Sequence, residues 1–105
     1  MEISPELASA CMKNYELIMK SDNFRPIEDS FTTTVSFSTS EFAEWLQQYK
    51  YLETSAQLNL AFGIYTPEVA REIGKPEYAG RLTTFIWPIV NGEAMAPFNA
   101  GELVP

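Results

Sequence analysis

Residues 58–90 read LNLAFGIYTPEVAREIGKPEYAGRLTTFIWPIV, and the pattern in this stretch decides the fold. Apolar side chains stand at every second position from Leu58 to Ile64, which is the period of a strand that buries one face. The positions between them are small or polar. Gly63 among them indicates a bulge or a close approach by another backbone or a ligand, and we expect a structural reason. The sequence therefore predicts a strand with a buried apolar face.

A second strand is predicted over Leu82–Val90, where both alternating sets are rich in β-forming residues. Such a strand is covered on both faces. Pro88 cannot donate a backbone hydrogen bond, so we expect it at an edge, at a bulge or at a solvent-facing position. Asn91-Gly92 suits the two positive-φ positions of a type I′ turn, which predicts a hairpin with residues 93–98 as a short partner strand.

Three helix starts are predicted from capping patterns at residues 4–6, 38–41 and 66–68. In the first and third, Ser or Thr at the N-cap is followed by Pro and Glu. The second matches a capping box, with Phe37 and Phe42 at the two positions of a hydrophobic staple. Trp45 falls on the apolar stripe of the second helix, so we expect it in the core.

The element order predicts an α+β domain that spans residues 1–105. Phe31–Phe37 alternates cleanly and reads as one further strand. We expect a mostly antiparallel sheet of about four strands with two main helices packed on one face. Residues 99–105 have no period and read as a surface tail.

Composition limits the partners of this chain. It has 105 residues, of which 46% are hydrophobic, so one domain with its own core is expected. Seven basic residues oppose fourteen acidic ones, giving a net charge of -7, which disfavours direct nucleic-acid binding and attracts a basic protein. No membrane segment or leader pattern is seen. Cys11 is the only cysteine, which fits a reducing compartment, so a cytoplasmic location is expected.

The sequence lacks the residues on which most enzyme catalysis depends. Histidine is absent, which removes imidazole-dependent triads and the commonest metal ligand. No phosphate-binding glycine pattern occurs, and Cys11 lies on an apolar helix face. The carboxylate pairs at residues 41 and 44 and at residues 68 and 72 stand at helix starts, where the helix dipole accounts for them. We expect no enzyme activity, no cofactor and no metal.

Surface residues remain as the candidates for function. Aromatic residues near loops and strand ends can anchor a protein interface, and one pair of adjacent acidic residues can add charge to it. The plain alternative is that Trp87 is core and that the tyrosines lie at the core rim. The candidate partner-binding residues are Tyr51, Tyr65, Tyr78, Trp87, Glu28 and Asp29.

Four short blocks resemble a loose group of small uncharacterised proteins common in Bacteroidetes-type bacteria. The blocks are FSTSEF at residues 37–42, LAFGIY at 60–65, LTTFIWP at 82–88 and FNAGEL at 98–103. The resemblance implies an arrangement of segments and no particular activity.

Three functions of different classes follow. The first is a non-catalytic acidic domain that binds a more basic protein and inhibits or masks it. The second is a small-molecule binding domain or minimal enzyme that uses the sheet face near Gly63, Tyr65 and Trp87. The third is an assembly module that pairs through a sheet edge, for which Phe31–Phe37 is the candidate strand and a homodimer the simplest product.

Overall fold

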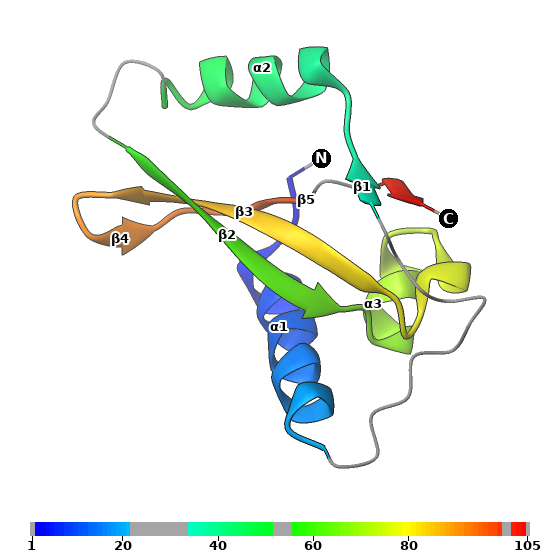
Figure 1. The fold of residues 1–105 in the computed structure, drawn as a ribbon. Helices are drawn as coiled ribbons and strands as arrows, with labels where there is room; N and C mark the ends of the chain where they lie inside the picture. Colours follow the sequence, from blue (N-terminus) through cyan, green and yellow to red (C-terminus); the bar gives the residue numbers. More distant parts are fainter. Residues whose placement is uncertain (1, 22–33, 52–55, 100–101, 105) are drawn as a thin grey trace.

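The computed structural model describes residues 2–21, 34–51, 56–99 and 102–104, and it confirms an α+β fold with a four-stranded antiparallel sheet (Figure 1). The elements are α1 (Pro5–Met19), β1 (Thr34–Ser36), α2 (Thr39–Gln48), β2 (Gln57–Ile64), α3 (Pro67–Glu72), the 3-10 helix η2 (Pro76–Tyr78), β3 (Leu82–Val90), β4 (Glu93–Ala94), β5 (Phe98–Asn99) and β6 (Glu102–Val104).

The main sheet is built around β3. On one side the whole of β2 pairs with β3, from Gln57 opposite Ile89 to Ile64 opposite Leu82. On the other side lie two short strands, because β5 pairs near the middle of β3 and β4 pairs near its end. Pro88 is buried on this inner strand, so the expectation of an edge or a solvent-facing position is wrong. Its carbonyl accepts a hydrogen bond from the Met95 N–H at 2.8 Å, and its missing N–H stands where the pairing of β3 with β4 ends.

The predicted hairpin is confirmed at Asn91-Gly92. Both residues have positive φ, 53° at Asn91 and 81° at Gly92, as a type I′ turn requires. The returning strand is shorter than expected, since β4 covers only Glu93–Ala94 and β5 begins at Phe98.

The expected tail is wrong for its described part. β6 pairs antiparallel with β1 in a separate two-stranded sheet, and its Leu103 side chain is buried. The predicted strand Phe31–Phe37 is observed from Thr34 to Ser36, and residues 31–33 lie outside the described residues. This strand joins β6 and not the main sheet.

Helix α1 packs against β2 at a point where no side chain separates them. A Cβ built on Gly63 would lie 3.1 Å from the Cβ of Cys11 and 2.6 Å from the ring of Phe85. The glycine therefore serves the close approach of a helix, as a structural reason predicts. Cys11, Ala8 and Phe85 are fully buried in this layer, which agrees with the expectation that Cys11 is a small buried hydrophobe.

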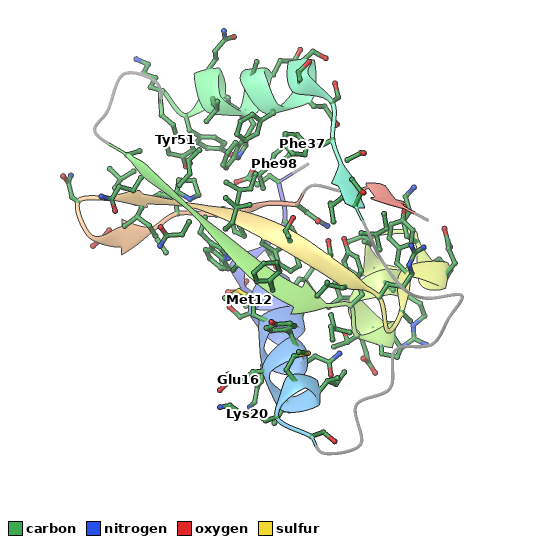
Figure 2. The ribbon with its side chains drawn as sticks, in the orientation of Figure 1. Met12, Glu16, Lys20, Phe37, Tyr51 and Phe98 are labelled. Atoms are coloured by element: carbon green, nitrogen blue, oxygen red, sulfur yellow. The ribbon has the colours of Figure 1, made fainter. Side chains whose placement is uncertain are left out.

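Helix α2 lies on the opposite face of the sheet, so the expectation of both helices on one face is wrong (Figure 1). Its Trp45 is 5% exposed and packs in a cluster with Ile86 and Phe98, which confirms the predicted core position. Figure 2 shows Phe98 and Phe37 in the layer between α2 and the sheet.

All three predicted helix starts are confirmed. Ser4, Ser38 and Thr66 are the N-caps, and each side-chain oxygen accepts a hydrogen bond from the backbone N–H three residues later. The rings of Phe37 and Phe42 are 5.2 Å apart, as a hydrophobic staple requires. In the described part of the chain, none of the helices has the length and apolar character needed to cross a membrane.

Candidate functional site

The structure differs most from the predicted fold in which face of β2 is buried. The period of two is confirmed, but the face that α1 covers is the small one, with Ala61 and Gly63. Three of the four apolar side chains on this face are largely uncovered: Leu58 is 41% exposed, Leu60 66% and Phe62 53%. At the end of the strand Ile64 is buried, and the Phe62 ring lies 5.8 Å from the ring of Tyr15 on α1. Large apolar side chains in a row on a surface mark an interaction site more often than they mark chance.

These side chains form one wall of a hollow of about 460 Å³, which we call the β2 groove. The other walls come from the adjoining part of β3, from β1 and from the start of α2. The lining residues are Thr34, Val35, Phe37, Phe42, Leu58, Leu60, Phe62, Leu82, Thr84 and Ile86. No charged residue is among them, so the groove is suited to apolar side chains of a ligand or partner.

Helix α2, which supplies Phe42 to the groove, carries acidic residues. Glu41 and Glu44 are exposed on α2, whose residues Thr39–Gln48 include no Lys or Arg. β2 itself, Gln57–Ile64, carries no charged residue. An apolar surface beside a helix with acids and no bases favours a partner that combines apolar and basic side chains.

The predicted aromatic patch is not assembled. Tyr65 and Tyr78 are buried, at 0% and 7% exposure, so neither belongs to an exposed contact surface. Tyr51 and Trp87 are half-buried and lie in different clusters, the first beside Trp45 under α2 and the second on the α1 side of the sheet. The plain alternative describes Tyr65 and Tyr78 better than the patch does.

The predicted acidic pair Glu28 and Asp29 lies outside the described residues. The other acidic pairs are at the surface: Glu41 and Glu44 on α2, and Glu68 and Glu72 on α3 are exposed. Among the residues that the structure describes, no group of three or more His, Cys, Asp or Glu side chains is placed to hold a metal ion.

The sheet face around Gly63 and Tyr65 is filled. Cys11 and Phe85 occupy the space above Gly63, and Tyr65 is fully buried. A hollow of about 610 Å³ lies further along the same face, near Trp87, Met12 and Asn59. It is open to the side, and no charged group lines it.

Three fully buried polar side chains, those of Tyr65, Thr83 and Asn99, meet at the Tyr65 hydroxyl. The Asn99 Nδ2 donates to this hydroxyl at 2.7 Å, and the hydroxyl lies 3.1 Å from Asn99 Oδ1. Thr83 Oγ1 donates to it at 3.4 Å. Burial raises the pKa of Tyr65, and these hydrogen bonds oppose that rise. The three side chains satisfy one another, which is typical of a structural network.

Arg81 was not singled out by the sequence pattern. Its side chain is 8% exposed, and its carbon Cζ lies 5.4 Å from the centre of the Tyr78 ring. Its Nε and Nη2 have no hydrogen-bond partner among the residues that the structure describes. Stacking on a tyrosine offsets part of the cost of burying a guanidinium. Arg81 lines neither of the two hollows described above.

The three side chains on the apolar face of β2 were also missed as surface residues. Alternation alone predicts burial for them. Their exposure goes with the edge position of β2, beyond which no strand pairs in the described part of the chain, and that position depends on distant segments. Comparisons of the chain with protein-family models, with curated proteins and with solved structures give no match.

Proposed function

We propose that this protein is a non-catalytic interaction domain that binds a more basic protein through the β2 groove and thereby masks or inhibits it. The observation that carries the proposal is the exposure of three large apolar side chains, Leu58, Leu60 and Phe62, on one strand of the main sheet. A partner that covers them removes apolar surface from water at the centre of the contact.

Covering this surface supplies part of the free energy of binding. Burying a whole Leu or Phe side chain contributes about 1.5–3 kcal/mol. Because roughly half of each of these three side chains is already buried, covering the rest contributes on the order of 3 kcal/mol in total. Phe37, which is 38% exposed at the same groove, adds to this.

The charge of the chain supports a basic partner. A net charge of -7 speeds the approach of a positively charged protein and slows that of nucleic acids and of other acidic proteins. The proposed location is the cytoplasm, where a reducing environment keeps the single Cys11 as a thiol.

The test is capture of partners by three forms of the protein: wild type, Leu60→Lys and Leu17→Lys. Leu17 is 62% exposed on α1 and does not line the groove, so its substitution is matched to that of Leu60 in chemistry, charge and exposure. Each form is immobilised and exposed to a lysate of the cells that make the protein.

The proposal expects a basic protein that wild type and Leu17→Lys retain, that Leu60→Lys loses, and that is released as the salt concentration rises. If all three forms retain the same proteins, the groove is not the binding surface. If wild type retains no basic protein at low salt, the proposed function is wrong.

A second candidate function is assembly through a sheet edge. The edge expected from the sequence, Phe31–Phe37, is paired with β6 from Thr34 to Ser36. The observation that favours assembly is at β2, whose outer edge has no strand partner within the described residues. Sedimentation over a range of concentrations tests it, and a monomer at every concentration would exclude it.

A further inference from the structure

The direction of the backbone groups of β2 follows from one hydrogen bond. The Tyr65 N–H donates to the Arg81 carbonyl at 3.0 Å, in register with the β2–β3 ladder. In an antiparallel pair, residues alternate between those bonded to the neighbouring strand and those directed away from it. Odd-numbered residues of β2 therefore bond to β3. The N–H and C=O groups of Leu58, Leu60 and Phe62 point to the outer edge.

Two other features agree with this alternation. Pro88, which has no N–H, is the residue opposite Leu58. A proline fits there because the two residues form a pair without hydrogen bonds. At the other end of the strand, Asn14 Nδ2 donates to the Ile64 carbonyl at 3.0 Å, so an even-numbered carbonyl is satisfied from outside the sheet.

The same three residues thus present both an apolar surface and outward-facing backbone hydrogen-bonding groups. Leu58, Leu60 and Phe62 carry the exposed apolar side chains, and they also carry the outward backbone groups. Natural sheets protect such edges with Lys, Pro, bulges or covering elements. β2 contains no charged residue and no proline, and within the described residues no strand lies against its outer edge.

We propose that the partner binds by adding an extended strand to the outer edge of β2 between Gln57 and Phe62, with its apolar side chains over the β2 groove. This inference rests on the proposed function and specifies how the partner binds. Strand addition supplies backbone hydrogen bonds for affinity, and alternate side chains supply specificity. Asn14 at the Ile64 carbonyl ends the available edge.

The chemistry of the added segment follows from charge. The segment has apolar residues at alternate positions, which lie beside Leu58, Leu60 and Phe62, and Lys or Arg at the remaining positions. A second copy of this chain is disfavoured as the occupant because two molecules of charge -7 repel each other. A basic segment is attracted by that net charge and by Glu41 and Glu44 on α2.

The first measurement is residue-resolved amide hydrogen exchange on the free full-length protein. The amides of Leu58, Leu60 and Phe62 should exchange at least about tenfold faster than those of Asn59 and Ala61, which bond to β3. Equal protection of both sets would show that the outer edge is already paired, and it would overturn the inference.

The second measurement adds a capped peptide of sequence KVKVKVK as the probe. At saturation it should slow exchange at Leu58, Leu60 and Phe62 by about tenfold or more. Two control peptides separate the contributions: KVKPKVK cannot complete a strand because of its proline, and EVEVEVE reverses the charge. Both should need at least about tenfold higher concentration. Equal protection by KVKPKVK, or no protection by KVKVKVK at 1 mM, would overturn strand addition.

The two proposals are separated by a partner that wild type captures and Leu60→Lys does not. Amide exchange of this protein is then measured with that partner bound. Slower exchange at the three outward amides supports strand addition. Capture without slower exchange means that the groove binds the partner by another geometry, so the inference fails and the proposed function stands. If these amides instead become protected as the concentration of the protein alone rises, the occupant is a second copy and the inference is wrong.

Discussion

The two faces of β2 differ in a way that their composition does not suggest. The face with Ala61 and Gly63 is covered by α1 and belongs to the core. The face with the larger side chains, Leu58, Leu60 and Phe62, is the exposed one. Small residues let a helix approach the backbone closely, whereas bulky ones on the outermost strand need a further element to cover them. Burial therefore follows from what packs on a face and not from how apolar that face is.

The largest expected effect compares one phenylalanine from each face. Phe85 is fully buried on the α1 side and Phe62 is 53% exposed on the other. Phe85→Ala should lower the free energy of unfolding by about 3–5 kcal/mol, because it leaves a cavity. Phe62→Ala should lower it by no more than about 1 kcal/mol. Urea unfolding of both variants checks this, and equal losses would mean that the exposed face is in fact covered.

The close approach of α1 can be tested by adding a single methyl group. Gly63→Ala should destabilise the protein by about 1–3 kcal/mol, because the new Cβ would meet the Phe85 ring and Cys11. The nearest atom belongs to a side chain, so Phe85→Leu in the same molecule should recover part of the loss. A double-mutant cycle with strictly additive effects would show that the two positions do not interact.

A smaller effect is expected at the start of α2, the helix above the exposed face. Ser38→Ala removes the side-chain acceptor for the Glu41 N–H and should cost about 1 kcal/mol. Ser40→Ala, in the same helical turn, is the control, since its hydroxyl bonds only to that of Ser38 among the described residues. Thermal unfolding distinguishes them. A larger loss for Ser40→Ala than for Ser38→Ala would contradict the assigned cap.

The smallest effect is a pH dependence that arises from the covered face. Burial raises the pKa of Cys11 above its usual 9.0, with a partly opposing backbone hydrogen bond from Thr66. The folded protein therefore keeps the thiol proton at a pH where the unfolded chain has lost it. Stability from this group is complete below the unfolded pKa and falls as pH rises above it.

Cys11→Ala should therefore lose less stability than wild type between about pH 8.5 and pH 10. The measurement is urea unfolding of both proteins across this range. Burial also raises the pKa of Tyr65, and Cys11 adds a lesser rise, so the part of the Tyr65 contribution that comes from burial is common to both proteins. Parallel pH profiles for the two proteins would show that Cys11 does not titrate differently on unfolding.

Features that depend on neighbouring residues could be predicted from the sequence. The three helix starts, the staple of Phe37 and Phe42 and the turn at Asn91-Gly92 each need only a few consecutive residues, and all are observed. The period of two in β2 is also local, and it is correct.

Features that depend on distant contacts could not be predicted in this way. The pairing of β1 with β6 joins segments from opposite parts of the chain, and it leaves β2 rather than β1 at the outside of the main sheet. The side on which α2 packs is likewise set by Phe98, far along the chain. The β2 groove results from both, which is why local periodicity assigned its residues to the core.

The contact between Cys11 and Gly63 has a consequence for how this protein changes over evolutionary time. A larger residue at either position would push the helix off the strand, so each position limits what natural selection accepts at the other. Homologues should therefore keep small residues at both places, or enlarge one while shrinking a neighbour such as Phe85. The row Leu58, Leu60, Phe62 is free of that restraint, and its variation among homologues would instead follow the identity of the molecule that each one binds.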